Sequence, residues 1–201
     1  FYRGRMSRQR TRRIRKLLTY RKHIIKELID TEAMYIYDLS LIISDFKYPM
    51  RSLKLLSSQE LAVIFTNVEE LKKLNEEFYC ELSNRFDHYF PYQLMFDIVI
   101  KLTPFFKIYF EYCNNYEQGQ RTIVRLRKER SEFDEYLRVK CNQDKFRRLG
   151  IDGFLIKPVQ RLPKYVILLK DLVKHTPEDH PDLNNIKGAL NAFDKVVYHN
   201  N

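Results

Sequence analysis

Glu32 is a charged residue whose position in the sequence suggests a chemical role. It occupies a gap in a stripe of apolar residues spaced by threes and fours, as on one face of a helix: Ile25, Ile29, Ile36, Leu39, Ile43 and Phe46. A carboxylate on such a stripe is costly if it is buried without a partner. Either Glu32 pairs with a Lys or Arg of another helix or tips out at the stripe's edge, or it faces a partner protein.

Three cations form a second candidate group in residues 154–176. Lys157, Arg161 and Lys164 follow the spacing i, i+4 and i+7, opposite an apolar stripe formed by Leu155, Val159, Leu162, Val166, Leu169 and Val173. The ordinary explanation is a solvated cationic face, and the alternative is a surface that binds a partner.

Two prolines in the same segment favour the second explanation. Pro158 fits the start of a helix, but an interior proline such as Pro163 removes a hydrogen bond and costs roughly 3 kcal/mol. We expect a kink at Pro163 that turns Arg161, Lys164 and Tyr165 out of the regular helical line. Such violations of local rules concentrate at functional sites.

Covalent and metal chemistry find no support in the sequence. It contains no P-loop, GxGxxG, GxSxG or HExxH motif, and its histidines and cysteines lack ligand spacing: His23, His88, His175, His180, His199, Cys80, Cys113 and Cys141. We therefore expect no metal, no cofactor and no covalent enzyme mechanism. The odd, scattered cysteines favour a reducing, cytoplasmic location. The sequence shows neither a signal peptide nor a transmembrane span.

The positive charge is confined to one end of the chain. The formal net charge is +10, and residues 1–22 hold ten of the 36 Lys and Arg but no acid. Subtracting these ten leaves 26 bases against 26 acids in residues 23–201. A nucleic-acid groove across the fold is therefore not expected.

Helices must position these residues. With 201 residues, 44% of them hydrophobic, and only 5 Gly and 7 Pro, the sequence predicts one all-α domain shaped as an elongated multi-helix bundle. Ser57 and Glu60 have capping-box spacing. Pro104 follows an expected N-cap at Thr103. The predicted helices cover about residues 12–46, 57–88, 92–102, 103–116, 120–140 and 154–176, with a last helix from Pro181.

Three blocks of the sequence resemble Dbl homology (DH) domains, the exchange modules for Rho-family GTPases. These blocks are "IIKELIDTEAMYIYDL" at 24–39, "FKIYFEYCNNYEQGQ" at 106–120 and "FLIKPVQRLPKYVILLKDLVKHTPEDHPD" at 154–182. The resemblance implies an oblong helical bundle over residues 21–201, preceded by a basic helical extension at 1–20. It also implies a guanine-nucleotide exchange factor that remodels switch I and switch II of a GTPase without covalent chemistry.

The resemblance assigns roles to individual residues. It places Glu32 against switch I and Lys164 against switch II, with Asn201, or Asn200 if the alignment shifts by one, also on switch II. Gln160 and Arg161 match the family's "QR" pair, which braces the site and contributes to the interface. Pro163 stands where many members have Leu. The rival interpretation is a non-catalytic helical scaffold that binds a GTPase, calmodulin or membrane.

The basic extension carries a hypothesis of its own. "FYRGRMSRQRTRRIRKL" resembles the latter half of an IQ motif, with Arg3, Gly4 and Arg8 at the matching positions, which implies a calmodulin-like partner. The alternative is a solvated extension or one attracted to an anionic membrane surface, with recruitment from the cytoplasm to the plasma membrane. The sequence leaves these alternatives open, and we expect no nucleic-acid partner.

Overall fold

A single helix, α1, runs from Tyr2 to Leu41 and forms the longest element of the protein. The structure is a computed structural model that describes residues 2–198, with side chains described for residues 7–197. α1 continues into the π-helical segment η1 (Ile42–Lys47) and α2 (Tyr48–Ser52). Because α1 crosses residues 20 and 21 without a break, the predicted boundary there is not marked in the backbone and stays a prediction.

The remaining elements are also helical, and residues 2–198 contain no strand. Their bounds are α3 Ser58–Phe65, α4 Val68–Asp87, α5 Asp97–Leu102, η2 Thr103–Lys107, α6 Ile108–Glu129, α7 Ser131–Cys141, η3 Asp144–Phe146, α8 Ile151–Leu155, α9 Lys157–His175 and α10 Leu183–Tyr198. This confirms the predicted all-α class.

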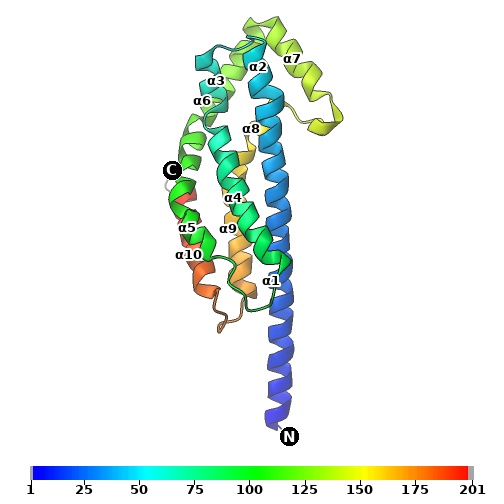
Figure 1. Ribbon diagram of the computed structural model, residues 1–201, viewed down its shortest axis with the longest axis vertical. Coiled ribbons are helices and arrows are strands. Elements are labelled where there is room, and N and C mark those ends of the chain that lie inside the picture. The colour runs from blue at the N-terminus through cyan, green and yellow to red at the C-terminus, as the bar shows by residue number, and fades with distance from the viewer. Residues whose placement is uncertain (1, 199–201) are drawn as a thin grey trace.

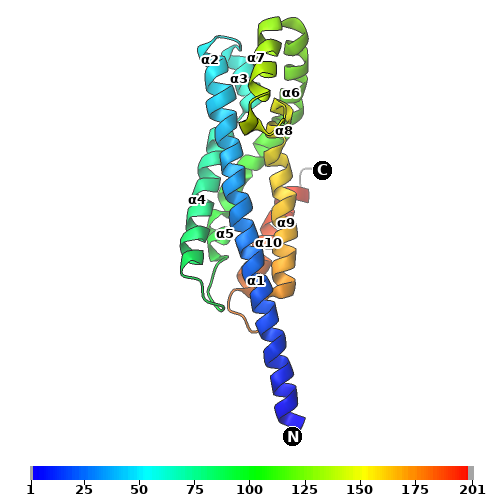
Figure 2. The ribbon, with the colours of Figure 1, turned by 90° about the vertical axis from the view of Figure 1, so that its right-hand side faces the viewer.

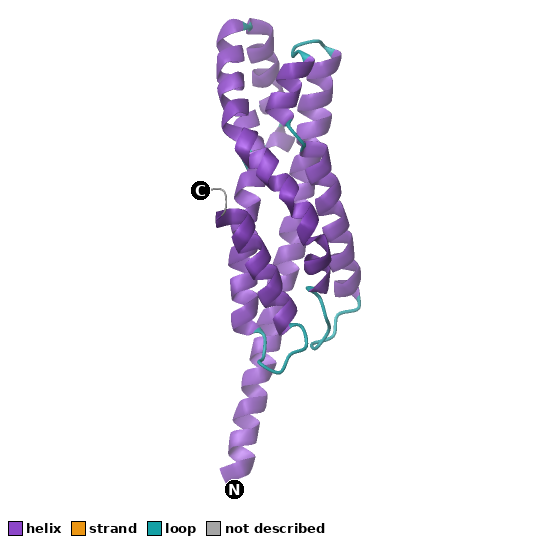
Figure 3. Cartoon of the chain, turned by 90° about the vertical axis from the view of Figure 1, so that its left-hand side faces the viewer, coloured by secondary structure: helices purple, strands orange, loops and turns teal. Residues whose placement is uncertain are grey.

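The helices form an elongated bundle in which α1 lies beside α4 and α9 (Figures 1 and 2). α10 packs against α9 and α5, and α3 packs against α6. The N-terminal part of α1 extends beyond one end of the bundle, where the loops after α4 and α9 also lie (Figure 3). α7 lies at the opposite end (Figure 1). No described helix combines the length and the apolar content needed to cross a membrane.

An aromatic cluster fills the core behind the junction of α1 and α9. The ring of Phe193 on α10 lies 4.7 Å from Phe106 on η2 and 4.8 Å from Tyr165 on α9, while Phe78 on α4 packs edge-on against Tyr165 at 5.9 Å. All four are almost fully buried. Such buried aromatic contacts supply both apolar area and preferred geometry, so they hold α9 firmly against its neighbours.

Several predicted helix boundaries were wrong. The helix expected at 57–88 begins with the predicted Ser57–Glu60 capping box but divides at Thr66, whose backbone is not helical. A break was expected between the helices at 103–116 and 120–140, yet Gly119 in that gap lies inside α6, which ends only at Glu129. A Cβ atom at Gly119 would lie 3.2 Å from the carbonyl oxygen of Val63, so the glycine permits the close approach of α6 to α3.

The kink expected at Pro163 does not end the helix in the described backbone. α9 continues through Pro163, and the actual break lies earlier, between α8 and α9, with Pro158 in the first turn of α9. Pro163 is exposed, so the proline ring occupies the solvent side of the helix. The last helix starts at Leu183 rather than Pro181, and Thr103–Pro104 open the 3₁₀ segment η2 rather than α6 directly.

Candidate functional site

Glu32 lies inside the protein, between α1 and α9. Its side chain is fully buried and accepts hydrogen bonds from two nitrogens of Arg161, with the Arg161 Nε to Glu32 Oε2 distance at 3.1 Å. The Tyr165 hydroxyl lies 2.7 Å from the same oxygen. The ion-pair explanation is therefore the one observed. The expectation that Glu32 faces a partner is corrected, because a carboxylate enclosed by α9 has no surface to offer.

A wider hydrogen-bond network continues from Glu32 toward α4. The Tyr165 hydroxyl also lies 2.9 Å from Asn75 Oδ1, and the Tyr109 hydroxyl lies 3.0 Å from the same Asn75 oxygen. Since a hydroxyl has one proton, Tyr165 donates to Glu32 or to Asn75 at any moment. Burial raises the pKa of Glu32, while Arg161 and Tyr165 oppose that rise. The network fixes the register of α1, α4 and α9 against one another.

Arg161 faces the core rather than the solvent, contrary to the predicted cationic face. Only 6% of its side chain is exposed, and its guanidinium lies 4.5 Å from the Tyr165 ring centroid. Its Nη1 also donates to Thr31 Oγ1 at 3.0 Å. The predicted bracing role fits this position, whereas a direct contact between Arg161 and a partner does not.

A second acid–base pair joins the same two helices at the surface. Lys164 Nζ lies 2.6 Å from Glu27 Oε1, and their side chains are 38% and 50% exposed. Glu27 precedes Glu32 by five residues, which places the two carboxylates about 140° apart around α1. Glu32 therefore faces the core and Glu27 faces solvent. Glu27 was not predicted from the sequence, because an exposed glutamate on a helix interrupts no apolar pattern.

Exposed side chains surround this surface pair. Tyr20, Glu27 and Met34 follow one face of α1 at intervals of seven residues, or about two turns. Gln160, Lys164 and Ile167 follow one face of α9. We call these six residues the seam surface. Tyr20, Met34 and Ile167 are each more than half exposed, so the surface combines large apolar groups with an ion pair, as protein interfaces commonly do.

The other predicted site residues have different outcomes. Gln160 is exposed, one turn before Lys164. Asn200 and Asn201 lie outside the described residues. Arg3 and Gly4 lie within α1, but their surroundings are outside the part that the structure describes. Arg8 is exposed. Among the described side chains, no group of three or more His, Cys, Asp or Glu is arranged to hold a metal ion.

Comparison with known proteins places this arrangement among exchange-factor domains. Residues 24–201 match the RhoGEF domain family. Two relatives from Dictyostelium discoideum are similar: Myosin-M heavy chain, 33% identical over 178 residues, and Guanine exchange factor for Rac 30, 32% identical over 191 residues. These matches cover 89% and 94% of this chain but only 10% and 11% of the relatives. The chain thus spans about a tenth of the length of these two relatives.

Solved structures agree with that result. A structure of the Vav1 exchange factor is 27% identical, with a TM-score of 0.80, and the match covers 88% of this chain and 47% of that chain. A DH/PH fragment of PDZRHOGEF, solved in complex with human RhoA, has a TM-score of 0.87 at 20% identity, covering 92% and 54% of the two chains. The second likeness shows the shared fold.

Proposed function

Because the chain belongs to the RhoGEF domain family, we propose that its seam surface accelerates guanine-nucleotide release from a Rho-family small GTPase. The observation that carries the proposal is the exposed Glu27–Lys164 pair at the junction of α1 and α9. The names of the similar proteins support the partner class, since one is an exchange factor for Rac and one was solved with RhoA.

The surface pair is suited to exchanging partners. An exposed ion pair contributes at most about 1 kcal/mol, because solvent screens both charges. Separating Lys164 from Glu27 therefore costs little, and each group becomes available to an opposite charge or a backbone dipole of the GTPase. A buried pair such as Arg161–Glu32 cannot be recruited in this way, because separating it leaves charges in a low-dielectric interior.

Catalysis of exchange requires differential binding and no covalent step. The surface must bind the nucleotide-free GTPase better than the loaded form, since only a difference in affinity shifts a population. The role that the resemblance gave to Glu32, contact with switch I, passes in this proposal to Glu27, and Lys164 keeps its contact with switch II. In this proposal the buried network of Glu32, Arg161 and Tyr165 does not contact the GTPase and holds α1 and α9 in place under the surface pair. Gln160 lies beside Lys164, and Asn200 or Asn201 remains a proposed switch II contact.

The test measures release of a fluorescent GDP analogue from a panel of Rho-family GTPases. Glu27→Ala and Lys164→Ala are each expected to slow exchange by roughly 30-fold, the loss of a hot spot worth about 2 kcal/mol. Arg121→Ala is the matched control, because it removes an exposed cation from an intrahelical ion pair on α6 and is expected to leave the rate unchanged.

The same assay separates the alternatives. Wild-type exchange rates in folded Glu27 and Lys164 variants would rule out the assignment of these two residues. Binding of a nucleotide-free GTPase without faster release would instead identify the chain as a non-catalytic scaffold. Loss of exchange in Glu32→Ala without loss of stability would return the direct role to Glu32.

A further inference from the structure

The basic arm, residues 7–18 of α1, carries a concentrated positive charge. It contains six cations and no acid, and all six side chains are exposed: Arg8, Arg10, Arg12, Arg13, Arg15 and Lys16. Within the described residues, none of the six forms an ion pair, whereas cations of the bundle such as Arg85 and Lys164 do. The arm therefore presents a fixed field that attracts anions from outside.

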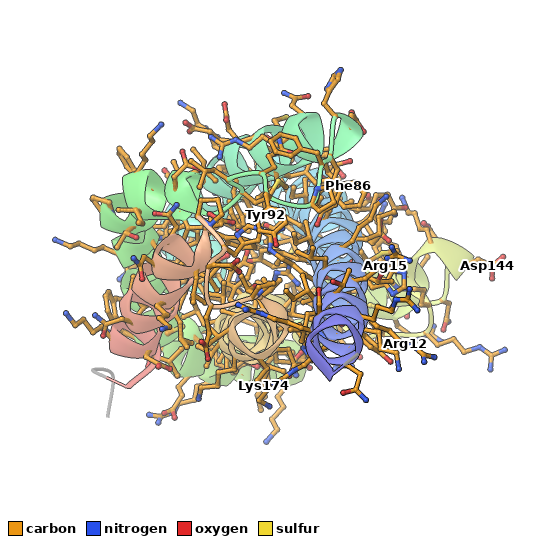
Figure 4. All side chains as sticks on the ribbon, turned by 90° about the horizontal axis from the view of Figure 1, so that it is seen from below. Arg12, Arg15, Phe86, Tyr92, Asp144 and Lys174 are labelled. Carbon is orange, nitrogen blue, oxygen red and sulfur yellow. The ribbon has the colours of Figure 1, made fainter. Side chains whose placement is uncertain are left out.

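Apolar groups gather beside the arm at the same end of the bundle. An open groove of about 560 Å³ separates Ile14 and Leu18 of the arm from the loop after α4, where it is lined by Phe90, Pro91 and Tyr92. The rings of Phe90 and Tyr92 are 56% and 39% exposed. Seen along the axis from this end, Arg12 and Arg15 mark α1, and Tyr92 lies on the neighbouring loop (Figure 4).

A second groove lies on the other side of the arm. It measures about 540 Å³ and runs from Arg10, Arg13 and Leu17 to Val173 and Pro177 beside the end of α9. The carboxylates of Glu178 and Asp179 also line this groove, so they offset part of the charge of Arg10 and Arg13, whereas Arg8, Arg12, Arg15 and Lys16 do not line it. Ile14 borders both grooves, so the apolar side of the arm faces the loops after α4 and α9. Helical spacing places Arg8, Arg12, Arg15 and Lys16 on one face of the arm, while Arg10 and Arg13 lie beside the apolar residues. A helix that combines a basic face with apolar residues is typical of those that lie in a membrane interface.

We propose that the basic arm and the Phe90–Tyr92 loop together bind an anionic lipid surface. The arm's guanidinium groups contact lipid phosphates and carboxylates, and the rings of Phe90 and Tyr92 enter the headgroup layer. Charge complementarity selects this partner, because six unpaired cations match a surface of repeated negative charge. A fluid headgroup layer also accepts the aromatic rings without a shaped pocket. This binding is independent of nucleotide exchange.

The test is co-sedimentation of the 201-residue chain with phosphatidylcholine vesicles that contain about 30% phosphatidylserine or none. We expect binding only to the anionic vesicles. Arg12→Ala/Arg13→Ala is expected to weaken that binding about 25-fold, since each surface cation contributes about fivefold in affinity. Added salt is expected to weaken it further, because screening shortens the range of exposed charges.

Two further variants make the test specific. Phe90→Ser/Tyr92→Ser is expected to reduce the part of the binding that persists at high salt, since that part depends on apolar burial. Arg121→Ala/Lys128→Ala is the matched control, because it removes two exposed cations from α6 near the opposite end of the bundle (Figure 1), and binding is expected to stay unchanged.

Three results would overturn the proposal. The first is equal binding to vesicles with and without phosphatidylserine. The second is unchanged binding in the Arg12→Ala/Arg13→Ala chain when circular dichroism shows that it is folded. The third is no vesicle binding together with capture of calmodulin through Arg12 and Arg13, which would identify the arm as a protein-binding helix.

Discussion

Along α1, the charged residues of the first half and of the second half have different surroundings. The cations of the basic arm are exposed and form no ion pair within the described residues, although Glu178 and Asp179 line the same groove as Arg10 and Arg13. Further along the same helix, Arg21 is fully buried against Asp182 at 2.6 Å, and Glu32 is fully buried against Arg161. The comparison shows that one helix uses charge for two purposes. Buried pairs position α1 in the bundle, and the exposed cations remain available to external partners.

Arg21 shows how the second half of α1 accommodates a buried charge. Asp182 accepts hydrogen bonds from Arg21 and from the backbone N–H groups of Met95 and Phe96, at 3.0 Å and 3.2 Å. The Arg21 Nη1 lies 3.3 Å from the Tyr89 hydroxyl. This cluster joins α1 to the loops after α4 and α9, so the base of the arm is fixed, while the arm's cations form no ion pair with the side chains that the structure describes.

The largest effect is expected from breaking a buried pair. Glu32→Ala leaves the Arg161 guanidinium buried without a countercharge, which should lower the free energy of unfolding by about 3–5 kcal/mol. Urea denaturation measures this change. The double variant Glu32→Leu/Arg161→Met removes both charges and should recover most of the loss. A single variant that loses less than about 1 kcal/mol would show that the pair does not position α1.

An intermediate effect on the free energy of unfolding is expected from a change of pH, through His180 near the point where the arm enters the bundle. His180 Nε2 donates to the Pro91 carbonyl oxygen at 2.8 Å, and Nδ1 accepts from the Asp182 N–H at 3.0 Å, an arrangement that requires the neutral ring. Burial lowers the pKa of His180 below 6.5, while the Pro91 carbonyl opposes that shift. Arg21, Asp182 and Asp179 are the charged groups that act on the ring.

The sign of this pH effect follows from proton uptake. As the pH falls below 6.5, His180 binds a proton in the unfolded chain but stays neutral in the folded protein. The free energy of unfolding therefore decreases. The slope is at most about 1.4 kcal/mol per pH unit for one proton. Denaturation at several pH values should show that His180→Gln flattens this slope, whereas exposed His88→Gln retains it. An unchanged slope in His180→Gln would contradict the assignment.

The smallest effect is expected in the arm. Arg12→Ala/Arg13→Ala should change the free energy of unfolding by less than about 0.5 kcal/mol, because neither cation forms an ion pair within residues 7–197 and alanine favours helix. Thermal denaturation of this variant and of Arg21→Ala, run side by side, compares the loss of exposed arm cations with the loss of a buried cation. A loss above about 1 kcal/mol in the arm variant would mean that its cations also hold the bundle together.

The spacing of apolar residues predicted the helices well where one helix face is regularly buried. The stripe through Ile25, Ile29, Leu39, Ile43 and Phe46 is buried, and the Ser57–Glu60 capping box is present. The break at Thr66 was missed because neither Gly nor Pro marks it. Gly119 and Pro163 were read as helix ends or kinks, yet both lie within helices. Gly119 serves the contact with α3, which no local pattern reveals.

The candidate site was only partly predictable because its contacts are long-range. The pattern identified Glu32 as unusual and left both burial and exposure open. Its partner Arg161 lies 129 residues away in sequence, and only the fold brings them together. Lys164 was identified through resemblance, and its exposure agrees with that prediction. Glu27 carries no local signal, because what distinguishes it from other exposed acids is its ion pair with Lys164, which lies 137 residues later in the sequence.

The continuity of α1 sets a geometric relation between the arm and the seam surface. Fifteen residues separate Arg12 from Glu27, so a regular helix places them about 22 Å apart along one axis. Each residue adds about 1.5 Å and 100° of rotation, so under the two proposals above α1 sets the spacing and the relative orientation of a bilayer on the arm and a G protein on the seam surface. Deleting a single residue between Arg12 and Glu27 would shorten that spacing slightly but rotate the G protein by more than a quarter turn about the helix axis.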